Sequence, residues 1–295
     1  MKRLSLVCLL VIATIVLSAR GANFSISLFT ANEVTTQSFT ANGPTRVVVQ
    51  MFNGNIDVIT GNDSTVKIDV DKRGSGNSQE AAQADLKNVS VKMTQTGDTI
   101  NVVASRTDKR VDIGNSGASA SIRAPIGTVL ELHTGNGKVV LAGPVGDVVA
   151  TTSNGSIKVK GAAGQLNLTT SNGGITINGG AGQLVLETSN GGIDVTSDKV
   201  TVLARNSNGS ITFKGSLAAG NQSFRTDNAS ITLNLPANTS FSVNADTSNG
   251  KIRSDFKVTS SNLSETLLQG TVGENPQTSI MLHSSNGNID IKKSK

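Results

Sequence analysis

The chain has 295 residues, with 26 basic and 21 acidic side chains, and its formal net charge is +5. Glycine is abundant at 31 residues, tryptophan and tyrosine are absent, and aromatic residues make up 3% of the sequence. This composition excludes a bulky aromatic core. It favours many short strands joined by tight turns.

Residues 1–22 have the pattern of a secretory signal peptide. A basic start, Met1 to Arg3, precedes an apolar run from Leu4 to Leu17, and Ser-Ala-Arg-Gly-Ala follows up to Ala22. The apolar run is short for a bilayer span, and no comparable stretch occurs later. We therefore expect an exported protein that is periplasmic, cell-surface or extracellular, with no transmembrane segment in the mature chain.

Removal of this leader changes the cysteine count and the charge. The single cysteine, Cys8, is lost, so no disulfide can constrain the mature chain, and stability must come from burial and backbone pairing. Loss of Lys2, Arg3 and Arg20 leaves 23 basic against 21 acidic residues, a net charge near +2. Because the body of the mature chain contains no cluster of lysine or arginine, nucleic acid is not an expected partner.

A Thr-Ser-Asn-Gly motif and its close variants recur every 18 residues in the middle of the chain. The asparagines of the five regular copies are Asn136, Asn154, Asn172, Asn190 and Asn208. Looser copies place asparagine at 228, 249 and 286. In stacked coils the five asparagines would form a structural ladder, with side-chain amides hydrogen-bonded between coils. A polar groove that binds a ligand is the alternative interpretation.

A finer period of nine residues runs through the same region. Pairs of apolar residues separated by one position begin every nine residues, from Leu130/Leu132 to Ile211/Phe213. This spacing places both members of a pair on one face of a strand. Asn-Gly could form hairpin turns in an antiparallel meander or corners in a solenoid. The 18-residue near-identity favours an all-β, parallel β-solenoid with coils of about 18 residues, since like coils then stack on like.

The flanking regions are less regular. Residues 23–125 are expected to form a strand-rich cap and the first coils, with one short helix from Ser78 to Lys87. Residues 126–295 are expected to form the solenoid region, continuous with the preceding part and most regular over 130–213. Near the C-terminus the nine-residue step resumes with Ile280/Leu282, and the lysine-rich residues 292–295 are expected to shield the last sheet edge.

The repeated Thr-Ser-Asn-Gly-Gly-Ile-Thr-Ile segment at 170–177 and its copies resemble the bacterial putative-adhesin families of β-helical domains of unknown function. The resemblance covers most of the mature chain and rests on a structural motif. It implies a right-handed parallel β-solenoid at the cell envelope. It carries no catalytic, cofactor or metal residues over to this sequence.

Three sets of residues are candidates for metal binding or catalysis: the repeat at 179–187, three aspartates and two histidines. Residues 179–187 resemble a calcium-binding nonapeptide, but Leu184 stands where that motif needs an aspartate, so no metal site is expected. Asp57, Asp194 and Asp290 follow similar motifs in distant coils and are expected on the solvated outer face. His133 and His283 have no metal-ligand neighbours at usable spacing. We therefore predict no catalytic residues and no cofactor.

The resulting expectation is a non-catalytic exported envelope or surface protein, an adhesin or binding scaffold for an unknown protein, glycan or cell-surface ligand. A polysaccharide-active β-helix enzyme and an envelope-stress accessory protein are the alternatives. One column of stacked outer-face residues is expected to contain Lys158, Thr176, Asp194 and Thr212.

Overall fold

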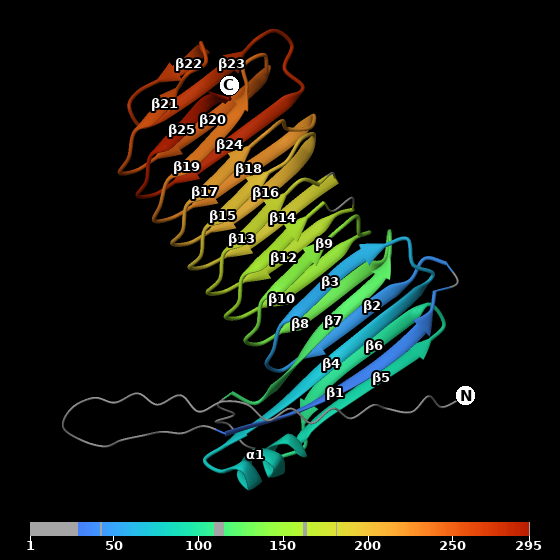
Figure 1. Cartoon of the computed structure of the whole chain (residues 1–295). Coiled ribbons are helices and arrows are strands. Elements are labelled where there is room, and N and C mark those ends of the chain that lie inside the picture. The colour runs from blue at the N-terminus through green and yellow to red at the C-terminus, as the bar shows by residue number, and fades with distance from the viewer. Residues whose placement is uncertain (1–28, 42, 109–114, 162–163, 181, 295) are drawn as a thin grey trace, which may run out of the picture.

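A computed structural model describes residues 29–41, 43–108, 115–161, 164–180 and 182–294. The signal peptide predicted at residues 1–22 lies outside the described residues. Two long sheets face each other, and turns join them so that the chain winds into stacked, flattened coils (Figure 1). One short helix, α1 (Gln79–Leu86), lies at the end opposite the C-terminal coils. The described part of the chain holds no helix with the length and apolarity needed to cross a bilayer.

The first sheet, sheet A, has 12 strands. In spatial order they are β1 (Phe29–Thr40), β4 (Thr65–Gly76), β7 (Gly117–Pro125), β3 (Ile56–Gly61), β9 (Val139–Ala142), β11 (Ile157–Lys160), β13 (Ile175–Asn178), β15 (Ile193–Thr196), β17 (Ile211–Lys214), β19 (Ile231–Pro236), β25 (Ile289–Ser294) and β21 (Ile252–Ser254).

The second sheet, sheet B, has 13 strands. In spatial order they are β22 (Thr259–Leu263), β23 (Leu267–Val272), β20 (Phe241–Thr247), β24 (Thr278–Ser284), β18 (Gly220–Thr226), β16 (Val200–Asn206), β14 (Gly182–Thr188), β12 (Leu166–Thr170), β10 (Val148–Thr152), β8 (Val129–Thr134), β2 (Arg46–Met51), β6 (Thr99–Arg106) and β5 (Val89–Thr96).

Strand pairing in the central region is parallel and in register between neighbouring coils. Val148 pairs with Leu166, and Leu166 pairs with Leu184, in sheet B. Ile157 pairs with Ile175 in the same way in sheet A. The antiparallel meander is therefore wrong for this region, and each Asn-Gly occupies a corner between the two sheets. The predicted all-β, solenoid-like architecture with one short helix is confirmed for the described residues.

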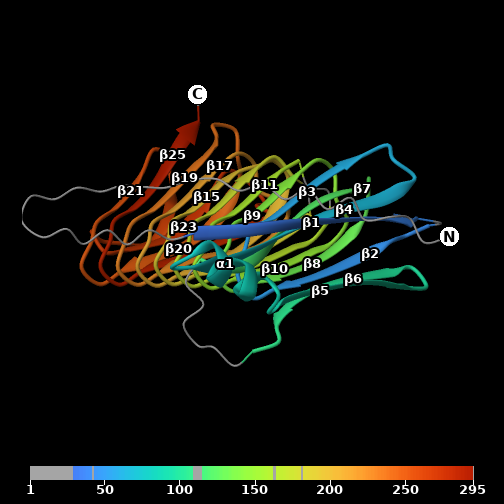
Figure 2. The same ribbon diagram turned by 60° about the horizontal axis from the view of Figure 1, so that its bottom comes forward.

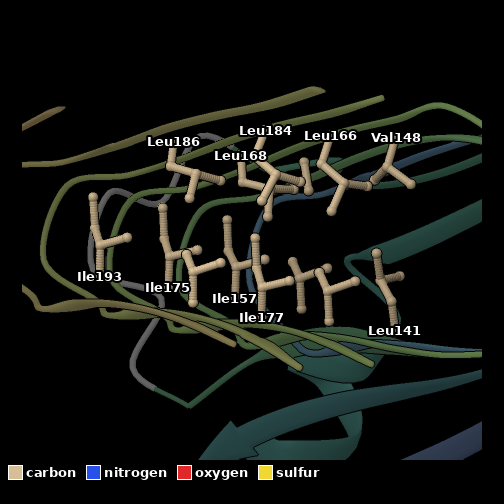
Figure 3. Packing of buried hydrophobic residues seen from close by; sticks show 14 of the residues in the cluster. Leu141, Val148, Ile157, Leu166, Leu168, Ile175, Ile177, Leu184, Leu186 and Ile193 are labelled. Atoms are coloured by element: carbon tan, nitrogen blue, oxygen red, sulfur yellow. The ribbon is translucent and has the colours of Figure 1, made fainter. Parts of the chain in front are cut away.

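The core is built from the apolar pairs that the nine-residue period identified. Their strands alternate buried and accessible residues, as in β13, where Ile175 and Ile177 are fully buried and Asn178 is exposed. Figure 3 shows Leu166 and Leu184 of sheet B facing Ile157 and Ile175 of sheet A. Burial of each of these Leu or Ile side chains stabilises the folded state by about 1.5–3 kcal/mol relative to leaving the side chain exposed. Leu184, at the position where a calcium roll would hold a ligand, is part of this core.

Helix α1 begins at Gln79, directly after the predicted Ser78. The Ser78 hydroxyl accepts a hydrogen bond from the backbone N–H of Ala81, at 3.1 Å, and so caps the first turn. Ala82 and Leu86 then form a small buried cluster with Ala31 of β1. The helix therefore packs against the end of sheet A, where β1 pairs antiparallel with β4 (Figure 2).

The spatial order of the coils departs from chain order at the C-terminal end. β24 lies between β18 and β20, and β25 lies between β19 and β21. The last residues of the chain thus form an internal coil, and the earlier strands β20 to β23 form the outermost layer. Lys292 and Lys293 lie in β25 beyond the residues that pair with β21, so the expectation that residues 292–295 shield the last edge stays a prediction; residue 295 lies outside the described residues.

Candidate functional site

The five predicted asparagines lie on one corner of successive coils, where the structure brings their amides together. The Nδ2 of Asn172 donates to the Oδ1 of Asn154 at 2.7 Å, and the Nδ2 of Asn190 donates to the Oδ1 of Asn172 at 2.8 Å. Asn154 donates to Asn136, and Asn208 donates to Asn190, in the same sense. Each internal amide therefore both donates and accepts within the ladder, although all five residues are exposed.

The looser motif copies extend this ladder in spatial order. Asn228 donates to Asn208, Asn286 donates to Asn228, and Asn249 donates to Asn286, each at 2.8 Å. Asn286 comes before Asn249 along the ladder because its coil is inserted between the coils of residues 228 and 249. The ladder therefore continues through these copies although their sequence spacing differs from 18 residues.

A second ladder runs beneath the asparagines and was missed in the sequence analysis. The buried Thr170 hydroxyl donates to the carbonyl of Gly155 in the preceding coil at 2.9 Å and accepts from the N–H of Gly173 at 3.2 Å. Thr152 and Thr188 bond in the same pattern. Its sequence signal was available, because a threonine stands two residues before each of the first four asparagines.

The glycine that follows each of the five predicted asparagines is required by a close approach between coils. A Cβ added at Gly173 would lie 1.8 Å from the carbonyl oxygen of Gly155, and one added at Gly155 would lie 1.7 Å from that of Gly137. These contacts leave no room for any other side chain. The Thr-x-Asn-Gly motif is therefore explained, residue by residue, by contacts within the corner.

The outer face of sheet A carries side chains that the corner contacts do not use. Lys158, Thr176, Asp194 and Thr212 are register partners in successive strands, so they form one column along the sheet. A neighbouring column contains Lys160, Asn178, Thr196, Lys214, Asn234 and Lys292.

The three candidate carboxylates share the first of these columns but are far apart. Asp57 and Asp194 are separated by four strand spacings, about 19 Å, and Asp194 and Asp290 by three, about 14 Å. A glycosidase needs its two carboxyl groups within about 5–10 Å. Burial raises the pKa of Asp57. The structure therefore does not bring these residues together as an acid–base pair.

Both histidines lie on the outer face of sheet B, each beside a carboxylate. His283 Nδ1 lies 2.6 Å from Asp246 Oδ2, between neighbouring strands, and His133 Nε2 lies 3.2 Å from Glu131 Oε1. Glu131 also pairs with Arg46. The described residues contain no cluster of three or more histidine, cysteine, aspartate or glutamate side chains that could hold a metal ion.

A deeply buried charge network lies in the cap, beside α1. Arg106 binds Asp85 at 2.7 Å and Asp108 at 2.6 Å, and Asp85 also accepts hydrogen bonds from Ser116 and from the backbone of Ser75. Burial by itself would raise the pKa of Asp85, but the hydrogen bonds from Arg106 and Ser116 outweigh it and the pKa is lowered. These contacts join α1 to two strands, β4 and β6, and to the segment before β7, so the network has a structural role.

The fold and its corner ladders define a repetitive all-β protein built from stacked coils. The chain belongs to the Toastrack DUF4097 family, whose model matches residues 45–292. The resemblance to bacterial putative-adhesin domains of unknown function is thereby confirmed.

The solved structures that match this chain are distant from it in sequence. A putative adhesin from Bacteroides fragilis is 12% identical, with 88% of this chain and 96% of that chain covered and a TM-score of 0.45. A putative cell adhesion protein from Clostridium sporogenes is 13% identical, with coverage of 89% and 100% and a TM-score of 0.29. A putative lipid binding protein from Parabacteroides distasonis is 12% identical, with coverage of 88% and 97% and a TM-score of 0.39. A search of curated proteins found no match.

Proposed function

We propose that the protein is an exported, non-catalytic binding scaffold of the bacterial cell envelope or surface, which holds a long polar sheet face against a ligand. The scaffold would be a right-handed parallel β-solenoid with coils of about 18 residues. The signal-peptide pattern of residues 1–22 supports export. The asparagine ladder, Asn136 to Asn208, serves in this proposal as corner support, since its amides bond to one another.

The observation that carries the proposal is the alignment of outer-face residues into continuous columns. Lys158, Thr176 and Asp194 are consecutive register partners, so side chains far apart in sequence repeat at about one strand spacing. Rigid columns of this kind suit an extended ligand, because the groups are held in place before binding. The wide separation of Asp57, Asp194 and Asp290 supports binding over glycan hydrolysis.

The proposal is tested with the leaderless protein and a panel of soluble and immobilised envelope polysaccharides. We expect saturable binding to at least one of them, with no new reducing ends after prolonged incubation. Turnover of any polysaccharide would establish the enzyme alternative. Co-purification with a membrane sensor, without glycan binding, would establish the envelope-stress alternative.

A further inference from the structure

One column on the outer face of sheet A combines separate lysines into a linear basic surface. We call its six residues, in spatial order Lys160, Asn178, Thr196, Lys214, Asn234 and Lys292, the basic column. Lys160 and Lys214 are three strand spacings apart, about 14 Å, and Lys214 and Lys292 are two apart, about 10 Å. The sequence contains no cluster of these lysines, because they come from coils well separated along the chain.

The lysines of the basic column are available to a ligand. All three are exposed, and none forms an ion pair with another described residue. The positions between them hold neutral hydrogen-bonding groups: Asn178 and Thr196 are exposed, and Asn234 is half-buried. The basic column therefore alternates cations with amides and a hydroxyl, and it contains no carboxylate.

Two acidic groups of this face, Asp194 and Asp290, lie in the adjacent column. Asp290 is 3.5 Å from Arg253, while Asp194 lies beside Thr176 and Thr212. Asp255, which follows β21, lies beyond Lys292 at the outer end. Lys158 adds a fourth cation next to Lys160. The face thus has a cationic side and a mixed side, with its net positive charge concentrated along the basic column.

We propose that the basic column binds an acidic polysaccharide, laid along the stacking direction of the coils; this inference rests on the proposed binding function. The carboxylates of such a chain would pair with Lys160, Lys214 and Lys292. Its hydroxyls would hydrogen-bond to Asn178, Thr196 and Asn234. Association is electrostatic in large part, so it weakens as salt is added.

The spacing of the cations favours a polysaccharide over nucleic acid. B-DNA carries one charge per about 1.7 Å of its axis, whereas the lysines stand two or three strand spacings apart, with neutral groups between them. The carboxylates of Asp194 and Asp290 on the same face would repel so dense a polyanion. They could accept hydrogen bonds from sugar hydroxyls.

The test compares wild-type protein with a triple variant, Lys160→Gln, Lys214→Gln and Lys292→Gln. A matched control variant, Lys87→Gln, Lys92→Gln and Arg205→Gln, removes the same charge from exposed positions. Lys87 directly follows α1, and the other two residues lie on sheet B. Binding of polygalacturonate, with neutral dextran as a negative control, is measured by calorimetry at two salt concentrations. Far-UV circular dichroism checks that both variants are folded.

We expect wild type to bind polygalacturonate and the column variant to bind it about tenfold more weakly or worse, while the control variant keeps wild-type affinity. Equal binding by the column variant, or an equal loss in the control, would overturn the inference even if the protein binds other envelope polysaccharides. Failure to bind polygalacturonate, with binding to a neutral polysaccharide retained, would overturn it and leave the proposed function standing. Duplex DNA bound as tightly as polygalacturonate through the same lysines would identify nucleic acid instead.

Discussion

At the scale of single residues, the Thr-x-Asn-Gly corner assigns a separate contact to each position. The threonine hydroxyl joins two coils from the inside, the asparagine amide joins them from the outside, and the glycine permits their close approach. The asparagine and glycine could be interpreted from sequence, since both are common in turns. The recurrence of the threonine is visible in the sequence, but the role of its hydroxyl is not, because the carbonyl that accepts from it, that of Gly155, belongs to the preceding coil.

Thr170→Val tests the buried ladder. The substitution keeps the shape of the side chain but removes a hydroxyl that bonds to Gly155 and Gly173. We expect the free energy of unfolding to fall by about 1–3 kcal/mol, because a buried carbonyl and N–H lose their partner. Urea unfolding measures the change. Thr169→Val, on the accessible face of the same strand, is the control and should change stability by no more than about 0.5 kcal/mol; equal losses would contradict the assignment.

Gly173→Ala tests the close approach between coils. The new Cβ would lie 1.8 Å from a backbone oxygen, so the coil must shift. We expect a loss of about 2 kcal/mol or more in the free energy of unfolding. Gly43, where a Cβ would meet nothing within 4 Å, offers the matched Gly43→Ala control. A stable Gly173→Ala protein with an unchanged melting temperature would show that the corners are looser than described.

At the scale of elements, the positions of the strands along the chain could be predicted more completely than their spatial order in the two sheets. The nine-residue apolar pairs report a local property, the alternation of faces, and so they predicted strands such as β13 and β16 directly. The insertion of β24 between β18 and β20 depends on pairing between distant segments. Because every coil presents a similar motif, the sequence contains no local signal for which coil stacks on which.

The inserted coil should make the C-terminus resistant to fraying. We expect the amide protons of β24 to exchange with solvent as slowly as those of β16, since both strands are paired on two sides. Hydrogen exchange with mass spectrometry measures this. A truncation that removes residues 278–295 should also expose β20 to rapid exchange. Fast exchange of β24 in the full chain would contradict the inserted arrangement.

The network around Asp85 should make the cap sensitive to acid. Its pKa is lower in the folded protein than the ordinary value of 3.8, so the charged carboxylate stabilises the fold above that value, and this contribution is lost as the pH falls through the lower folded pKa. We expect wild type to lose stability below about pH 4 more steeply than Asp85→Asn. Urea unfolding at several pH values compares them. Asp63→Asn, at an exposed position, should retain the wild-type pH profile; the same profile in Asp85→Asn would contradict the assignment.

At the scale of the whole molecule, the register of the coils decides which side chains act together. Lys160, Asn178, Thr196 and Lys214 follow the 18-residue period, so their alignment could have been found by writing the sequence in rows of that length. Lys292 joins them only because β25 is inserted beside β19. The basic column was therefore hidden from sequence composition, which indicated no basic cluster, and it emerges from stacking.

The most direct test of this account is lysine footprinting of the protein bound to polygalacturonate. Acetylation with and without the polysaccharide, followed by mass spectrometry, reports the protection of each lysine. We predict that Lys160, Lys214 and Lys292 are protected together while Lys87 and Lys92 react equally in both samples. Protection confined to Lys87 and Lys92, or equal reactivity of the three column lysines with and without saturating polysaccharide, would contradict the claim that this face of the solenoid is the binding surface.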